Sequence, residues 1–215
     1  MMRIWSAYRL LTVVAGAAVL SACVSVLPEA DPAPARFSLQ AGDYADAAAG
    51  PVDWSLIVAD PMATRAYDTV KIAVAHSAGR LDYYKGGEWS DRAPTLLRTA
   101  IVRTFENSGR ILNVGGPVTM PIADYTLQTD VRAFHIDERG GGARAAAEFF
   151  IRITDRRGRV VAAKKFVADE PVDVQDPGAF AEAFNVLSSS LLRDVADWTF
   201  DEVAVARRAL DEAPA

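Results

Sequence analysis

Apolar and polar side chains alternate strictly along the stretch Tyr125-Thr126-Leu127-Gln128-Thr129-Asp130-Val131-Arg132-Ala133. A repeat of two residues is the side-chain period of a β-strand, in which neighbouring residues point to opposite faces. The pattern therefore predicts a strand with one buried and one polar face. The residues expected on the buried face are Tyr125, Leu127, Thr129, Val131 and Ala133.

The same alternation continues in the next two segments of the chain. Apolar side chains alternate with Glu148 and Arg152 across residues 147–153, and a third strand is expected over residues 160–167. The connection 138–142 is rich in glycine, and residues 155–158 have the turn chemistry of a hairpin. Together these segments predict an antiparallel meander with one buried and one wetter face.

Shorter apolar runs precede this meander. They are too short for helices and are separated by turn residues, which favours strands. We expect these strands at residues 36–40, 54–59, 70–75, 81–85 and 111–114. The pair Gly86-Gly87 is expected to end the fourth of them, and residues 41–51 are expected to form a surface loop.

The first of two expected helices follows Ser90 or Asp91, either of which could cap it, with Pro94 in its first turn. Gly109 stands where a left-handed cap would end it. Apolar residues spaced three and four apart predict that one face packs on the sheet. That face consists of Leu97, Ala100, Ile101, Thr104 and Phe105.

The second expected helix begins at Pro177, with Asp176 as its N-cap, and frays beyond Trp198. Its apolar stripe is Phe180, Phe184, Leu187, Leu191, Val195 and Trp198. The order of strands, helix, strands, helix predicts an α+β fold. More specifically, we expect an α/β sandwich in which two helices cover a mixed, mostly antiparallel sheet.

The N-terminus has the pattern of a lipoprotein export signal. Arg3 and Arg9 precede an apolar stretch over residues 10–20, and Ser21-Ala22-Cys23 follows it. The apolar stretch is about 11 residues long, well short of the roughly 20 residues that span a bilayer as a helix. We therefore expect residues 1–22 to be a signal peptide that is removed before Cys23.

Cys23 is the only cysteine of the chain and is expected to be lipidated. Its thiol would carry a diacylglyceryl group and its freed amine a further acyl chain such as palmitate, which is enough for stable membrane anchoring. Val24 follows in place of aspartate, which favours the outer membrane, facing the periplasm, and leaves the inner membrane open. Residues 23–35, which contain three prolines, are expected to form a lipidated tether.

Composition bounds the rest of the chain. Residues 36–205 are expected to form a single domain, and residues 206–215 a flexible tail. The formal net charge of −5 argues against nucleic-acid binding. His76 and His135 lie in no metal-ligand spacing, and no Gly-x-Ser-x-Gly motif is present. We accordingly expect no metal, no cofactor and no catalytic residue.

Three aromatic side chains near the two glycines are the candidate contact site for a partner or a lipid. Tyr83, Tyr84 and Trp89 could line a groove for an acyl chain or a partner segment. The alternative is that Trp89 closes one end of the core. We favour the alternative, because strand alternation sends Tyr83 and Tyr84 to opposite faces.

An ordered set of short motifs resembles the ABC-type transport auxiliary lipoproteins, the PqiC/YmbA-like group. Besides the lipidation motif and the tether, the set covers nearly all of the chain after the signal. It consists of Arg36-Phe37-Ser38-Leu39, Leu56-Ile57-Val58 with Pro61, Tyr67 with Lys71-Ile72-Ala73-Val74, Leu81-Asp82-Tyr83-Tyr84 with Trp89, Leu96-Leu97, Phe105 with Ser108-Gly109, Asp124-Tyr125 with Leu127 and Phe134, and Asp194-Val195-Ala196-Asp197-Trp198.

The resemblance implies a non-catalytic periplasmic lipoprotein that works with an MCE-type (mammalian-cell-entry) protein, an ABC permease and an ATPase. Such systems are thought to move phospholipids or other hydrophobic molecules between the two membranes. On this hypothesis the exposed sheet edge and the Tyr83–Trp89 junction dock the MCE protein. Two rivals are a structural envelope lipoprotein without a transport role and a periplasmic hydrolase. A homo-oligomer is compatible with the sequence, which does not define the oligomeric state.

Overall fold

Three long antiparallel strands form the centre of the sheet in the computed structural model, which describes residues 33–44 and 50–212. They are β7 (Tyr125–Asp137), β8 (Ala143–Asp155) and β9 (Val160–Val172). β8 pairs with both neighbours along nearly its whole length. These are the strands of the predicted meander, and β9 extends five residues beyond its predicted end.

Six short strands complete a mixed sheet, which has nine strands in the described residues. On the side away from β8, the strands β2, β3 and β4 pair in turn with successive parts of β7, all in parallel. β5 is antiparallel to β4, while β1 and β6 add short parallel pairs at the edges. Their bounds are Ala35–Phe37 (β1), Leu56–Val58 (β2), Met62–Ala63 (β3), Lys71–Ser77 (β4), Arg80–Trp89 (β5) and Val114–Gly115 (β6).

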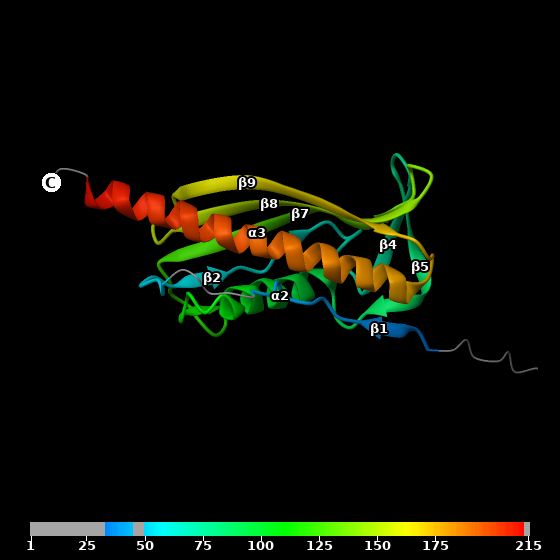
Figure 1. The fold of residues 1–215 in the computed structure, drawn as a ribbon, viewed down its shortest axis with the longest axis horizontal. Helices are drawn as coiled ribbons and strands as arrows, with labels where there is room; N and C mark the ends of the chain where they lie inside the picture. Colours follow the sequence, from blue (N-terminus) through cyan, green and yellow to red (C-terminus); the bar gives the residue numbers. More distant parts are fainter. Residues whose placement is uncertain (1–32, 45–49, 213–215) are drawn as a thin grey trace, which may run out of the picture. The chain divides into compact units, whose positions relative to one another are not determined.

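Two helices in the described residues pack on one side of this sheet, α2 (Ala93–Asn107) and α3 (Pro177–Asp211) (Figure 1). α3 lies along β9 and β8 and also touches β1, β5 and α2. The long antiparallel ladders, the short parallel pairs and the two helices make this an α+β fold. The predicted fold class is confirmed.

Aromatic side chains fill the layer between the helices and the sheet. Phe184 of α3 lies 4.4 Å from Phe134 and 5.3 Å from Trp89, measured between ring centroids. Nearer the other end of α3, Phe200 lies 5.5 Å from Phe105 of α2. All five predicted face residues of α2 are buried, and of the six on α3 only Trp198 is partly exposed. The helix faces were therefore predicted correctly.

A β-bulge in β7 overturns one part of the predicted pattern. Val131 pairs with Phe149, but Ala133 pairs with Glu148, so an extra residue lies between the two pairs. Such a bulge reverses which residues face the core. Beyond it Phe134 and Ile136 are buried in the core cluster, and Ala133 points to the opposite face. The prediction that Ala133 faces the core was wrong.

The predicted break at Gly86-Gly87 was also wrong, because β5 continues through both residues to Trp89. Gly86 has a positive φ of 85°, where the pairing with β4 shifts register. At Gly87 an added Cβ would collide with the ring of Pro177 at the start of α3. These glycines therefore let the strand bend and let α3 approach it closely.

The helix ends differ from their predictions in part. Arg92 is the N-cap of α2 and its side chain makes no capping bond, so neither Ser90 nor Asp91 caps the helix. Gly109 has the expected left-handed conformation, with φ of 63°. Asp176 caps α3 as predicted, accepting hydrogen bonds from the backbone N–H groups of residues 178 and 179.

The C-terminal half of α3 and the 41–44 segment are more ordered than predicted. α3 does not fray beyond Trp198 but continues to Asp211, and Phe200 and Val203 are buried. Gly42 is buried against both helices, and its N–H donates to Thr104 Oγ1 at 2.8 Å. This part of the expected surface loop is therefore packed against the core.

Candidate functional site

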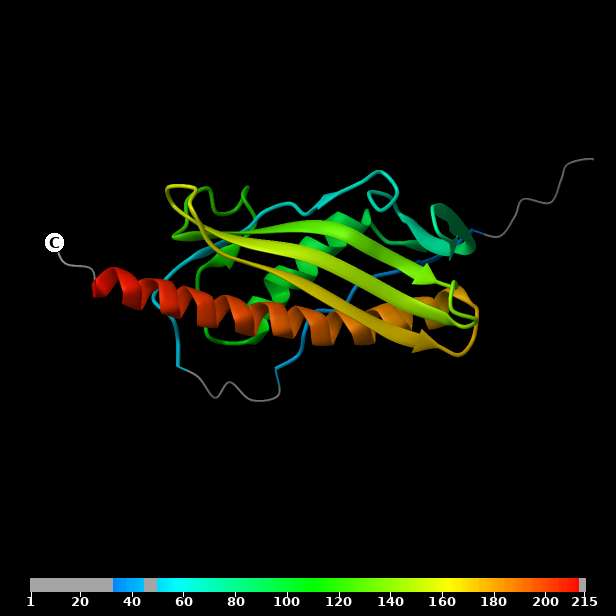
Figure 2. The same ribbon diagram turned by 90° about the horizontal axis from the view of Figure 1, so that it is seen from above.

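The face of β7, β8 and β9 on which no helix of the described residues packs is the surface that carries the candidate functional side chains. Figure 2 looks onto this side of the three strands, with α2 behind them and α3 running along the β9 side. Alternation places Phe150 and Arg152 of β8 here, because their neighbours Phe149 and Ile151 are buried on the helix side. We call this side of β7–β9, together with Tyr67 and Tyr83 beside it, the open face.

An aromatic ring between two guanidinium groups forms one part of the open face. The Cζ atoms of Arg132 and Arg152 each lie 4.5 Å from the centroid of the Phe150 ring. Arg132 is also 3.4 Å from Asp130, while Lys165 stands across the strand pair from Phe150. Cations stacked on an aromatic ring hold it in place, and Arg132 also lies 3.8 Å from Glu148.

His135 forms a second part of the open face, next to the β7–β8 turn. The bulge in β7 puts His135 on this side of the sheet, opposite Ala146. Its ring stacks on Tyr67, and its Nδ1 lies 3.0 Å from the Tyr67 hydroxyl. His135 is only 7% exposed, and its Nε2 has no partner among the described residues. One ring nitrogen of His135 is therefore buried without a hydrogen-bond partner in the described residues.

Burial also fixes the charge of these two side chains. Desolvation lowers the pKa of His135, outweighing the carboxylate of Asp137, which raises it. Desolvation likewise raises the pKa of Tyr67. Both groups are therefore neutral at pH 7. The pair offers hydrogen-bonding groups without a charge.

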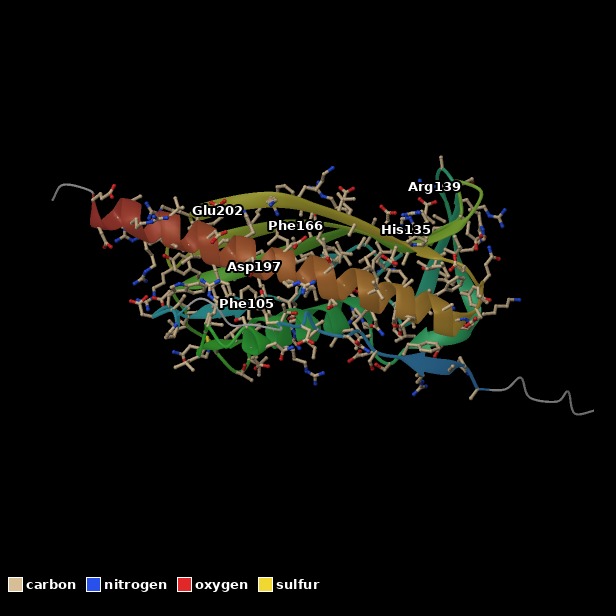
Figure 3. The ribbon with its side chains drawn as sticks, viewed as in Figure 1. Phe105, His135, Arg139, Phe166, Asp197 and Glu202 are labelled. Atoms are coloured by element: carbon tan, nitrogen blue, oxygen red, sulfur yellow. The ribbon has the colours of Figure 1, made fainter. Side chains whose placement is uncertain are left out.

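A hollow of about 350 Å³ lies beside His135. Its base includes the small side chains of Ala133 and Ala146, which leave the space unfilled. At its rim Arg139 binds Asp137 at 2.8 Å and Arg144 pairs with Asp169. The hydrogen bonds from Arg139 lower the pKa of Asp137 to about 2. Figure 3 shows His135 and Arg139 at the same end of the sheet, far from Phe105.

The three predicted aromatic residues do not share one surface. Trp89 is 2% exposed and packs against Phe184, and Tyr84 packs edge-on against Phe180 on the helix side. Tyr83 is 38% exposed and belongs to the open face, where its hydroxyl donates to the carbonyl of Ala66, next to Tyr67. Cys23, the predicted lipidation site, lies outside the described residues.

Two parts of the open face were missed in the sequence. His135 was given no role because it lies in no metal-ligand spacing, although it is buried in the open face. The signal was the change of parity in β7, where the apolar residues move from odd to even positions at Phe134 and Ile136. For Phe150 the signal was an aromatic residue at a polar position of β8, between Glu148 and Arg152.

The second histidine has a structural partner. His76 lies 2.7 Å from Glu138 and is partly exposed. Within residues 33–44 and 50–212 no three acidic, histidine or cysteine side chains group so that they could hold a metal ion. In the same residues, neither helix offers a stretch apolar enough to cross a bilayer.

Comparison with known proteins places the chain in a family. Residues 37–196 match the family model described as the ABC-type transport auxiliary lipoprotein component. The chain therefore belongs to this family, and the resemblance drawn from the sequence is confirmed. The family is described as a lipoprotein component of ABC-type transport, which implies that the protein belongs to the cell envelope.

Similar proteins agree in fold. The crystal structure of protein XCC0632 from Xanthomonas campestris, assigned to DUF330, is 28% identical, with a TM-score of 0.74 over 82% of this chain and 99% of that one. A second crystal structure, of an uncharacterized protein, is 12% identical, with a TM-score of 0.60 over 78% of this chain and 99% of that one. The second similarity shows the fold alone.

One curated relative matches over part of its length. The uncharacterized protein bll6063 of Bradyrhizobium diazoefficiens is 27% identical over 148 residues, which is 67% of this chain and 39% of the relative. The chain thus spans about two fifths of the length of this relative.

Proposed function

We propose that the protein is the lipid-anchored periplasmic component of a transport system that moves phospholipids or other hydrophobic molecules between the inner and outer membranes. The family match over residues 37–196 carries this proposal. The export pattern of residues 1–22 and the single cysteine at position 23 support anchoring through Cys23, with the outer membrane favoured by Val24. The protein acts by binding and not by catalysis.

The partner in this proposal is the MCE-type protein of the same system, which works with the permease and the ATPase. The open face supports a docking role because its composition is that of a protein interface. Arginine and aromatic side chains dominate the energetically important centres of interfaces. Phe150, Arg132, Arg152 and Tyr83 supply both kinds on a sheet face that no helix covers.

The hollow beside His135 gives the docking surface shape and specificity. A side chain of the partner that enters it would meet small alanine side chains at the base and His135 at the side. The arginine–aspartate pairs at the rim set the charge pattern that the partner must match, and such matching decides which partner binds more than how tightly.

Charge reversal on the open face tests the proposal. The full-length protein is purified from solubilised cell envelope as wild type and as the double variant Arg132→Glu with Arg152→Glu, and the MCE-type protein that accompanies it is quantified. Because two central arginines become repulsive, recovery should fall by about tenfold or more. Recovery from the variant equal to that from wild type would refute docking through this face.

Two matched variants complete the design. Arg36→Glu with Arg193→Glu reverses the same charge at exposed positions on β1 and α3, away from the open face, and should leave recovery unchanged. Cys23→Ala should release the protein from the membrane fraction into the periplasm. Persistent membrane attachment of this variant would contradict the proposed anchor.

A further inference from the structure

Three aliphatic side chains project into solvent from one loop at the end of the sheet where β7 begins. The loop covers residues 111–123, which we call the end loop, and it contains no charged residue. Leu112 is 88% exposed, Val118 90% and Ile122 77%. Exposed aliphatic side chains gathered in one segment mark a contact surface more often than isolated ones do.

The end loop is held in this shape by its own packing. Ile111 and Ala123 are buried at its two ends, and β6 within it pairs with β2. The carbonyl of Gly116 accepts hydrogen bonds from the N–H groups of Thr119 and Met120 at 3.1 and 2.9 Å. The exposed side chains are therefore fixed outward.

Arginines surround the end loop on two sides. Arg98 and Arg103 of α2 border a groove of about 500 Å³ whose opposite wall contains Val118. On the other side the β8–β9 turn carries Arg156 and Arg157, and Arg156 reaches back to Asp124 at 2.7 Å. Arg157 makes no ion pair with any described residue, and its side chain is exposed.

We propose that the end loop inserts into the surface of an anionic phospholipid bilayer. Its aliphatic side chains would enter the boundary of the acyl region, while the arginines on both sides bind lipid phosphates. An uncharged apolar segment with flanking cations is typical of proteins that bind at the membrane interface. A protein partner is less consistent with the loop, which has no aromatic residue and projects its aliphatic side chains from separate points.

The end loop is distant from the N-terminal strand. β1 pairs with β5 near the start of α3, whereas the end loop lies near the C-terminal end of α3 in both views (Figures 1 and 2). The proposed contact is therefore a second membrane contact, separate from any anchor that precedes β1. It does not depend on the partner proposed above.

A fluorophore that reports its surroundings tests the insertion. In the full chain with Cys23→Ala, a single labelled cysteine is introduced as Val118→Cys and, as a matched control, as Ser190→Cys on the exposed side of α3. Vesicles of phosphatidylcholine with phosphatidylglycerol are added, and emission and quenching by aqueous iodide are measured. The label at position 118 should shift to the blue and become protected from iodide, whereas the label at position 190 should remain accessible.

Further variants separate the contribution of the aliphatic side chains from that of the arginines. Two outcomes of the same measurements would overturn the proposal. Ile122→Asp, combined with the label at 118, should raise the lipid concentration needed for a half-maximal response about tenfold. Arg156→Glu with Arg157→Glu should raise it chiefly for anionic vesicles. Equal accessibility of both labels on vesicle-bound protein would overturn the proposal. A blue shift at 118 that appears without vesicles and grows with protein concentration would also overturn it, because the loop would then contact a second copy.

Discussion

At the scale of single residues, the open face depends on a buried neutral histidine. His135 lies within 3.0 Å of the Tyr67 hydroxyl and beside a hollow whose rim carries Asp137, Arg139, Arg144 and Asp169. Protonation would place a positive charge on the His135 ring, which is poorly solvated and lies among these ion pairs. The state of this one side chain therefore links the stability of the fold to pH.

Stability should fall when the pH drops below about 6.5, the ordinary pKa of histidine. Burial lowers the pKa of His135 in the folded chain, so the unfolded chain binds the proton more readily in this range. The loss begins near the unfolded pKa and levels off below the folded pKa. Urea unfolding at pH 7 and pH 5 should show a smaller difference for His135→Phe than for wild type. The change His76→Phe, at the exposed histidine, should not reduce that difference, and a reduction there alone would contradict the assignment.

At the scale of elements, the second half of α3 also contributes to the core. Phe200 is 2% exposed, lies 5.7 Å from Trp54 and 5.5 Å from Phe105, and has the guanidinium of Arg110 over its ring at 3.9 Å. These contacts join α3 to α2 and to the segment before β2. Tertiary packing therefore holds the helix as far as Val203, well beyond Trp198.

Truncation of Phe200 measures this contribution. Phe200→Ala should lower the free energy of unfolding by about 3–5 kcal/mol, the usual loss when a buried phenylalanine becomes alanine. Val205→Ala, at a side chain that is 53% exposed on the same helix, should change it by less than about 0.5 kcal/mol. Urea unfolding at pH 7 gives both values. Similar small losses for the two variants would mean that α3 beyond Trp198 is not part of the core.

Elements with one dominant period were predictable from the sequence, and irregular ones were not. The faces of α2 and α3 and the alternation in β8 follow from spacing alone, because each element keeps a constant period along its buried face. The bulge in β7 depends on pairing with β8, so the alternation within residues 125–133 does not predict it. The continuation of β5 through Gly86-Gly87 depends on Pro177, which is distant in sequence.

The candidate site was less predictable than the fold for the same reason. Tyr83, Tyr84 and Trp89 are close in sequence, but only Tyr83 lies on the open face. Phe150 becomes notable only when Arg132 and Arg152 stack on it from two strands. Sequence proximity thus selected the wrong group of aromatic residues, and strand pairing assembled a different one.

At the scale of the whole molecule, both helices in the described residues cover one side of the sheet and leave the central antiparallel strands open on the other. Antiparallel sheets tolerate an open face because their strands can alternate between apolar and polar residues. Among the described residues β9 pairs only with β8, so its other edge is open. This edge is protected from pairing with strands of other chains by Lys164, Lys165 and Pro171. The open face is therefore suited to specific docking, which is the central claim of the proposed function.

Site-specific photo-crosslinking in cells tests this claim most directly. A photoreactive phenylalanine analogue replaces Phe150 on the open face or, as a control, Val186 on the exposed side of α3. After irradiation the covalent adducts are purified and identified by mass spectrometry. We predict an adduct with the MCE-type protein from position 150 and none from position 186. No such adduct from position 150, or the same adduct from both positions, would contradict docking through the open face.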